Sequence, residues 1–110
     1  MINISTLTLS IKASATLAAN RGVTVAGAVP AAGANVIGFT RTAAASGDLV
    51  PTDADGTVLA EAGAAISAGA ALEVDNQGRV ITKNTGATVG RALAAAGAAG
   101  DVIEIRFIAN

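Results

Sequence analysis

The chain has 110 residues, a length that suits one domain, and its 28 alanines and 13 glycines leave many positions with almost no side chain. The net charge is −1, and there is no His, Cys, Trp or Tyr. This composition excludes disulfides, thiolate and histidine chemistry, Cys-based metal sites and the basic, aromatic surface of a nucleic-acid-binding protein.

A hydrophobic core is nevertheless expected. The larger apolar residues (Val, Ile, Leu, Phe and Met) number 29, more than a disordered chain contains. No apolar run approaches the roughly 20 residues of a membrane-spanning helix, and the N-terminus lacks the basic region of a signal peptide. We therefore expect a small, soluble, weakly charged domain with almost no catalytic equipment and no nucleic-acid, membrane or small-molecule partner.

The first segment, residues 2–12, alternates between apolar and polar residues, but the alternation changes phase at Ser5–Thr6. Two apolar residues face one way before this point and three face the other way after it: Ile2 and Ile4, then Leu7, Leu9 and Ile11. A strand with a bulge explains the change, as do two short strands that serve two surfaces. We expect an N-terminal strand or arm over 1–22 and a β-barrel body over 23–110, within one domain overall.

The middle of the chain predicts further short strands. Residues 23–29 form one that ends at Pro30, because proline cannot donate to a β-ladder. Residues 36–42 alternate again, and 43–48 form a turn of small residues. Asp55-Gly56 is a turn signal, so 49–51 and 57–61 are expected to pair as a hairpin around 52–56.

The second half of the chain is also predicted to consist of short strands joined by loops. Residues 62–71 are expected to be a loop, the alternative being a short helix favoured by alanine and opposed by two glycines. A hairpin is predicted for 72–83 and a strand for 88–93. A loop at 94–101 then leads to the strand 102–108, with Ile103, Ile105 and Phe107 inward. Eight or nine short strands indicate an all-β barrel or sandwich, with an α+β fold as the alternative.

Two stretches resemble each other: Val36-Ile37-Gly38 with a later Gly47-Asp48, and Val89-Gly90 with a later Gly100-Asp101. Each predicts a strand, a loop of small residues and a Gly-Asp turn, because glycine permits positive φ and Asp can accept from the backbone N–H two residues on. The predicted structural-turn residues are Gly38, Gly47, Asp48, Asp55, Gly56, Gly78, Gly90, Gly100 and Asp101.

No constellation of residues indicates catalysis or metal binding. The carboxylates Asp53, Asp55 and Glu61 lack the spacing of an EF-hand loop, and the glycine-rich stretch 86–100 lacks the order of a phosphate-binding loop. Nothing places a base beside a Ser or Thr nucleophile. Arginines outnumber lysines, which suits protein interfaces as well as an ordinary surface. Glu104 and Arg106 share a mixed face of the last strand.

The order of several Ala/Gly motifs resembles that of tailed-bacteriophage capsid cement (head decoration) proteins. The motifs are the run from Glu61 to Gly69, then Asp75 to Arg79, Val89-Gly90-Arg91 and Ala99-Gly100-Asp101. The resemblance implies a compact β-rich protein, not an enzyme and without a cofactor, made in the host cytoplasm and placed on the outer surface of the virion. It also implies a homotrimer that bridges neighbouring major capsid proteins and stabilises the expanded shell.

The N-terminal segment is the expected contact element. Leu7, Leu9 and Ile11 would close the sheet of the monomer, and Ile2 and Ile4 would add to a neighbour or to the capsid by strand addition. The alternative for this segment is a plain bent first strand. The alternative for the function is a surface-exposed module that binds host-surface or carbohydrate ligands, which the lack of Trp and Tyr disfavours.

Overall fold

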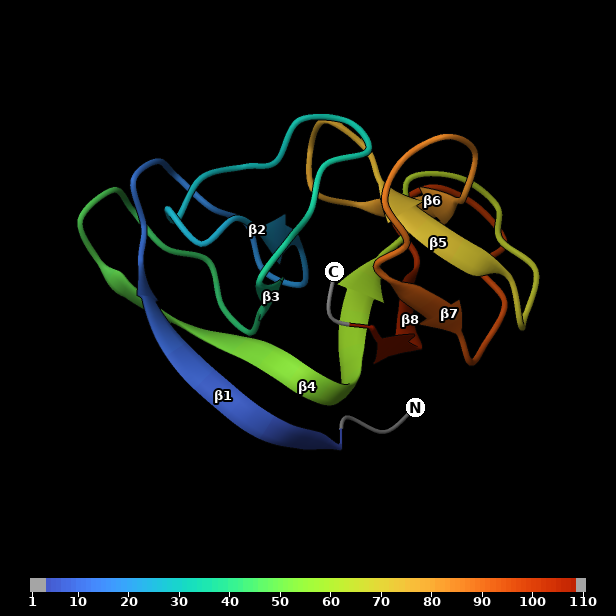
Figure 1. The fold of residues 1–110 in the computed structure, drawn as a ribbon, viewed down its shortest axis with the longest axis horizontal. Helices are drawn as coiled ribbons and strands as arrows, with labels where there is room; N and C mark the ends of the chain where they lie inside the picture. The colour runs from blue at the N-terminus through green and yellow to red at the C-terminus, as the bar shows by residue number, and fades with distance from the viewer. Residues whose placement is uncertain (1–3, 109–110) are drawn as a thin grey trace.

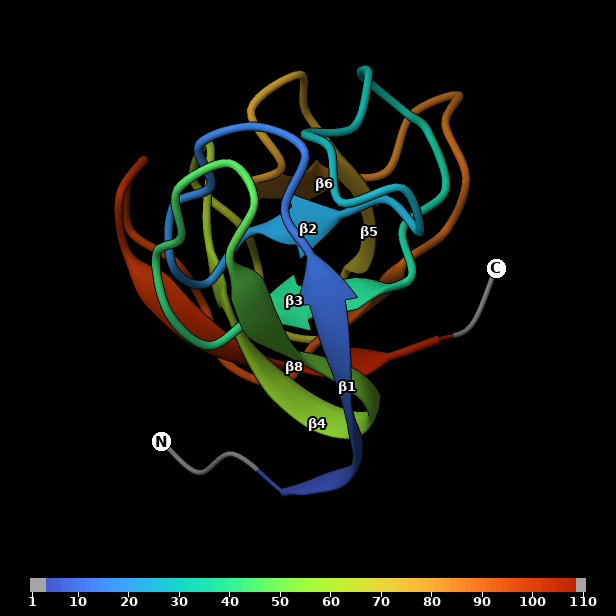
Figure 2. The same ribbon diagram turned by 90° about the vertical axis from the view of Figure 1, so that its left-hand side faces the viewer.

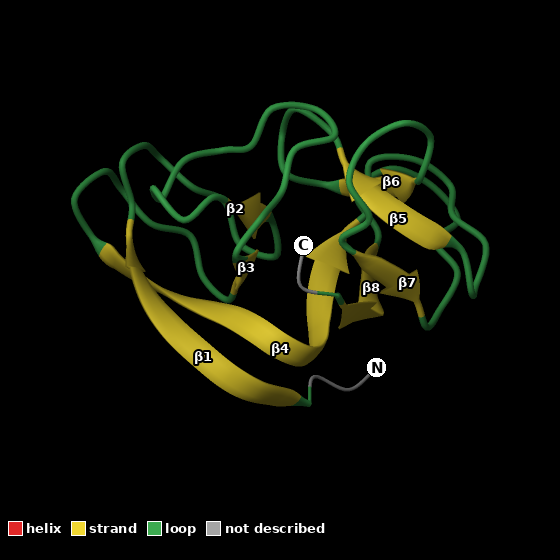
Figure 3. Ribbon diagram, viewed as in Figure 1, coloured by secondary structure: helices red, strands yellow, loops and turns green. Residues whose placement is uncertain are grey.

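The computed structural model describes residues 4–108, which form eight β-strands and no helix (Figures 1 and 3). The strands are β1 (Ser5–Lys12), β2 (Gly22–Val23), β3 (Gly38–Thr40), β4 (Leu49–Glu61), β5 (Ala71–Val74), β6 (Val80–Thr82), β7 (Gly90–Ala92) and β8 (Val102–Phe107). Residues 62–70 form the predicted loop before β5. Within 4–108, no helix is long and apolar enough to span a membrane.

The strands form one antiparallel sheet in the order β2-β3-β4-β8-β7-β5-β6, and β1 pairs with β4. A parallel bridge between Ala62 and Val80 brings β6 back beside the end of β4, so the sheet curls almost to closure. The all-β barrel prediction is confirmed. The inward face of β8 is also as predicted, since Ile103, Ile105 and Phe107 are buried.

Strand β4 is long and bent, and the predicted hairpin around 52–56 is wrong. The strand runs without a break from Leu49 to Glu61 and bends at Gly56, which has a φ of 87°. The part before the bend pairs with β1 and β3, and the part after it pairs with β8. The Asp55-Gly56 turn signal therefore produces a bend, because each half of β4 finds its partner in another strand.

The expected irregularity in the first strand is present. The pairing of β1 with β4 shifts register between Ser5 and Leu7 and again between Leu7 and Thr8, beside the predicted bulge at Ser5–Thr6. The predicted strand over 23–29 is mostly wrong, because β2 ends at Val23. The Thr24 N–H donates to the Ala28 carbonyl oxygen (3.0 Å), which closes a turn instead.

The sequence echo corresponds to a repeat in the structure. In the first half, the Ala13 N–H donates to the Asp48 carbonyl oxygen (2.8 Å) and the Gly47 N–H to that of Ala13 (2.7 Å). In the second half, the corresponding bonds join Ala62 with Asp101 (2.7 Å) and Gly100 with Ala62 (2.8 Å). Matching isolated bridges follow in each half, Leu17 with Ala44 and Ile66 with Ala96. The strands β1, β2, β3 and the first part of β4 thus correspond to the second part of β4, β5, β7 and β8.

Two glycines predicted as turn residues, Gly38 and Gly90, lie instead inside the equivalent strands β3 and β7. A Cβ at Gly38 would lie 2.3 Å from the Asp53 carbonyl oxygen, and a Cβ at Gly90 would lie 2.3 Å from that of Arg106. Glycine is needed at both places because the neighbouring strand approaches too closely for a side chain.

Each half has its own buried cluster. The smaller one contains Ala13, Leu17, Val23 and Val50, all in the first half. The larger one fills the second half and also takes Phe39 from β3, whose ring meets that of Phe107 edge-on with centroids 6.0 Å apart. The halves are therefore joined by an aromatic contact as well as by the continuous strand β4.

Candidate contact surface

Strand β1 lies at an outer edge of the sheet, because it pairs with β4 on one side and, among the described residues, with no strand on the other (Figure 2, where β1 faces the viewer). All eight of its residues are exposed or half-buried. Ile11 packs against the smaller core cluster, Leu9 is half-buried, and Leu7 is 47% exposed. The strand therefore closes the sheet through its C-terminal end and leaves apolar surface near its N-terminal end.

The pairing geometry shows which backbone groups of β1 face outward. The Arg41 N–H donates to the Pro51 carbonyl oxygen (2.9 Å), so the backbone of Pro51 is directed toward the β3 side. Ser10 is opposite Pro51 in the pairing of β1 with β4. In an antiparallel ladder such a residue directs its own N–H and C=O away from the partner strand. The backbone of Ser10 is thus presented at the open edge.

Hydrogen bonds from side chains hold β1 in place. Asp53 is 2% exposed, and its Oδ1 accepts from Thr8 Oγ1 (3.0 Å) and from Arg41 Nε (2.7 Å). Asp55 Oδ2 accepts from Thr6 Oγ1 (3.0 Å). A buried carboxylate with two donors is a satisfied charge. Asp53 therefore fixes the position of the edge strand.

The N-terminal end of the described chain lies at the bend of β4. The Ile4 N–H donates to Thr57 Oγ1 (2.8 Å), and the Thr57 N–H donates to the Ile4 carbonyl oxygen (2.8 Å). The Ile4 side chain is 58% exposed. The backbone here is fixed while the apolar side chain is left exposed. Ile2, the other predicted contact residue in this part, lies outside the described residues.

The carboxylates considered as a calcium site do not converge. Asp53 and Asp55 bond to different residues of β1, and Glu61 pairs with Arg21 (3.0 Å). Within residues 4–108, no group of three or more His, Cys, Asp or Glu side chains is placed to hold a metal ion.

Asp55 and Gly56 lie in the bend of β4, and the remaining predicted turn residues lie in turns or directly beside them. Gly47, Gly78 and Gly100 have positive φ. Asp48 and Asp101 accept from backbone N–H groups that precede them in the chain, those of Ala45 (3.2 Å) and of Gly97 (2.8 Å) and Ala98 (3.3 Å). The hydrogen bond expected at Asp48 and Asp101, from the backbone N–H two residues further on, is found instead at Asp75, which accepts from the Gln77 N–H (2.8 Å).

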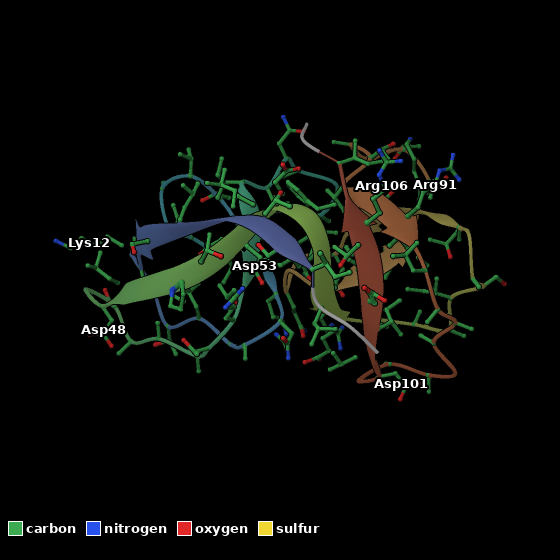
Figure 4. All side chains as sticks on the ribbon, turned by 90° about the horizontal axis from the view of Figure 1, so that it is seen from below. Lys12, Asp48, Asp53, Arg91, Asp101 and Arg106 are labelled. Carbon is green, nitrogen blue, oxygen red and sulfur yellow. The ribbon has the colours of Figure 1, made fainter. Side chains whose placement is uncertain are left out.

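The sequence did not indicate a second apolar patch, at the far end of the first half. Val25 is 76% exposed and lines a hollow together with Ile11 and Lys12 of β1. Leu49, which pairs with Lys12 in the sheet, is 68% exposed. Figure 4 shows Lys12 and Asp48 at this end of the molecule. The sequence predicted a strand over 23–29, which would include Val25, but the structure has a turn there that begins at Thr24 and leaves Val25 exposed.

The comparisons with known proteins come from a family model and from solved structures. The family model is described as phage cement protein, and it matches residues 3–107. No curated protein matches the chain. The chain is similar in structure to the head fiber gp8.5 N base of bacteriophage phi29, with a TM-score of 0.73, 15% identity and coverage of 93% of each chain. At this level of identity, the likeness shows a shared fold.

Proposed function

The chain belongs to the phage cement protein family, and from this premise we propose that it binds neighbouring major capsid proteins and stabilises the expanded shell. It is a structural component of the virion, on the outer surface of the capsid. The observation that carries the proposal is the match of the family model over nearly the whole chain. We propose no catalytic role and no cofactor.

The stabilising effect follows from mass action. A protein that binds only the expanded shell lowers the free energy of that state and leaves the other states unchanged. We propose that the chain acts as a homotrimer, because three linked copies raise the effective concentration of each further contact. Modest contacts then suffice, which agrees with a net charge of −1 and only two aromatic residues.

The proposed contact element is the N-terminal arm, residues 1–22, with 23–110 as the barrel body. The outward backbone of Ser10 and the exposed side chain of Ile4 support strand addition at this edge. The proposed contact residues are Ile2, Ile4, Leu7, Leu9 and Ile11. The half-buried side chains of Leu9 and Ile11 would anchor β1 to the barrel. The exposed side chains of Ile4 and Leu7 would contact the partner.

Heating undecorated expanded heads with and without the purified protein tests the stabilisation. At a free concentration about 100-fold above Kd, binding adds about 2.7 kcal/mol for each site. The opening temperature of the heads is expected to rise with protein concentration and then level off. Heads that carry bound protein but open at an unchanged temperature would contradict the proposal.

A further inference from the structure

Two arginines stand directly opposite each other on neighbouring strands. Arg91 of β7 pairs with Arg106 of β8 in the sheet register, and both side chains are exposed. Figure 4 shows the two at the same end of the molecule, with Lys12 and Asp48 at the other end. Cross-strand neighbours on one face have Cβ atoms about 5 Å apart, well within the Debye length of about 8 Å. Their charges therefore repel each other.

The other three arginines are each neutralised by a carboxylate: Arg21 by Glu61 (3.0 Å), Arg41 by Asp53 (2.7 Å) and Arg79 by Asp75 (3.0 Å).

Within residues 4–108, neither Arg91 nor Arg106 makes an ion pair. Arg91 Nη1 donates to the Gly69 carbonyl oxygen (3.1 Å). Glu104 lies on the same face two residues before Arg106, opposite Leu59, and forms no ion pair with either arginine. Like charges directly opposite each other destabilise a sheet, so the fold alone does not account for this pair.

The internal repeat shows what happens at the equivalent place in the first half. There the pair of Arg91 with Arg106 corresponds to the pair of Phe39 with Asp53. Phe39 is 1% exposed and Asp53 is 2% exposed, because other parts of the same chain cover them. In the second half this face is open, and Leu93 beside the arginines is 50% exposed.

We propose that Arg91 and Arg106 bind carboxylates of an acidic patch on the shell protein, an inference that rests on the proposed function. The virion's outer surface presents protein, so the available anions are carboxylates. Arg91 and Arg106 stand opposite each other in the sheet, and a guanidinium group offers the fork of two donors that one carboxylate accepts. The exposed Leu93 adds apolar contact, as at the centre of many interfaces.

The pair lies near the other proposed contact residues. Arg106 pairs with Thr57 in the sheet, and the Thr57 N–H donates to the Ile4 carbonyl oxygen (2.8 Å). The arginines and the exposed N-terminal end of β1 are therefore placed to act together as one contact surface.

Binding to expanded heads is to be measured for Arg91→Gln, Arg106→Gln and the matched control Lys83→Gln, which removes one exposed positive charge elsewhere. Each arginine variant is expected to raise Kd about tenfold, the size of one charge-assisted hydrogen bond. It should also weaken the salt dependence of binding. Lys83→Gln should bind like the wild type. The unfolding temperature of Arg106→Gln should equal or exceed that of the wild type, because a repulsion is removed.

The outcomes separate the two proposals. If the arginine variants bind expanded heads as tightly as the wild type does, the proposed role of Arg91 and Arg106 is overturned and the proposed function stays in place. Absence of wild-type binding would overturn the proposed function and this inference with it. A lowered unfolding temperature in the arginine variants would assign the pair to the fold. If the wild type binds duplex DNA and Arg106→Gln abolishes that binding, the arginine pair would be assigned to phosphate. This result, like a lowered unfolding temperature, would overturn the proposal.

Discussion

At the scale of single residues, Glu73 is a buried carboxylate that fixes a loop. It lies in β5 and is 7% exposed, and its Oε1 accepts from the N–H groups of Asn84 and Gly86 (3.1 Å for Gly86). The Asn84 bond, the Gly86 bond and the nearby Lys83 lower the pKa of Glu73 below its ordinary value of 4.5, while burial opposes them. The folded state therefore favours the ionised carboxylate.

A depressed pKa sets the sign of the pH dependence. The stability that the Glu73 carboxylate contributes is present above the unfolded pKa and is lost as the pH falls through the folded pKa. We expect Glu73→Gln to lower the unfolding free energy at pH 7 by about 1–3 kcal/mol. The deficit should shrink as the pH falls below about 4. Urea unfolding of both proteins at pH 7 and in acid measures this, and a deficit that does not change with pH would contradict the account.

A second residue prediction concerns the close approach of β8 to Gly90. A methyl group at Gly90 would lie 2.3 Å from the Arg106 carbonyl oxygen, so the strands must separate. Gly90→Ala is expected to cost about 1–3 kcal/mol of stability, as overpacking does elsewhere. Gly97→Ala is the matched control, since its Cβ would meet only Asp101 Oδ2 at 3.5 Å. Equal unfolding temperatures for the two variants would refute the close-approach argument.

At the scale of elements, the edge strand β1 allows a test that separates folding from association. Ser10→Pro removes an N–H that faces outward, and proline is tolerated at such edge positions. The variant should fold almost normally and associate weakly. Ile11→Pro removes an N–H that faces β4 in the same alternation and should lower the unfolding temperature. Both are measured by thermal unfolding and by binding to heads. Normal association of Ser10→Pro would exclude strand addition at this edge.

Deletion of residues 1–6 tests the arm as a whole. The deletion removes Ile2 and Ile4 together with the exposed bonds from Ile4 to Thr57 and from Thr6 to Asp55. Exposed hydrogen bonds contribute little to stability, so the barrel should stay folded. Association with capsids or between copies should be lost. The idea fails if the shortened chain, measured beside the full chain, sediments with heads to the same extent.

Much of this arrangement was predictable from the sequence, and the failures share a cause. Alternation correctly located the inward face of β8 and the irregularity in β1. The hairpin at Asp55-Gly56 failed because a local turn signal cannot show that each half of β4 has a distant partner. Gly38 was mistaken for a turn residue for the same reason, since the Asp53 carbonyl that requires glycine there is remote in the sequence.

The candidate site was predictable only in part. The phase change in 2–12 pointed to β1 as a strand with two roles. Which of its backbone groups face outward depends on its register with Pro51, and register follows from the whole sheet. The pairing of Arg91 with Arg106 is likewise a property of the fold. The sequence showed only that arginines are frequent and that Arg106 lies on a mixed face.

At the scale of the whole molecule, two similar halves share one long strand. Each half closes with the same backbone bonds around a Gly-Asp turn, and small side chains allow the close packing. The halves differ in what covers equivalent surfaces, because the face that is buried around Phe39 and Asp53 is open around Arg91 and Arg106. A repeated unit with one covered face and one open face is suited to further assembly.

The central claim is that this chain binds the expanded head, and co-sedimentation tests it most directly. The purified chain is mixed with undecorated expanded heads of the matching phage, and with unexpanded proheads as the control. The account predicts saturable binding to expanded heads and none to proheads. A folded protein that sediments with neither form, or with both equally, would contradict it.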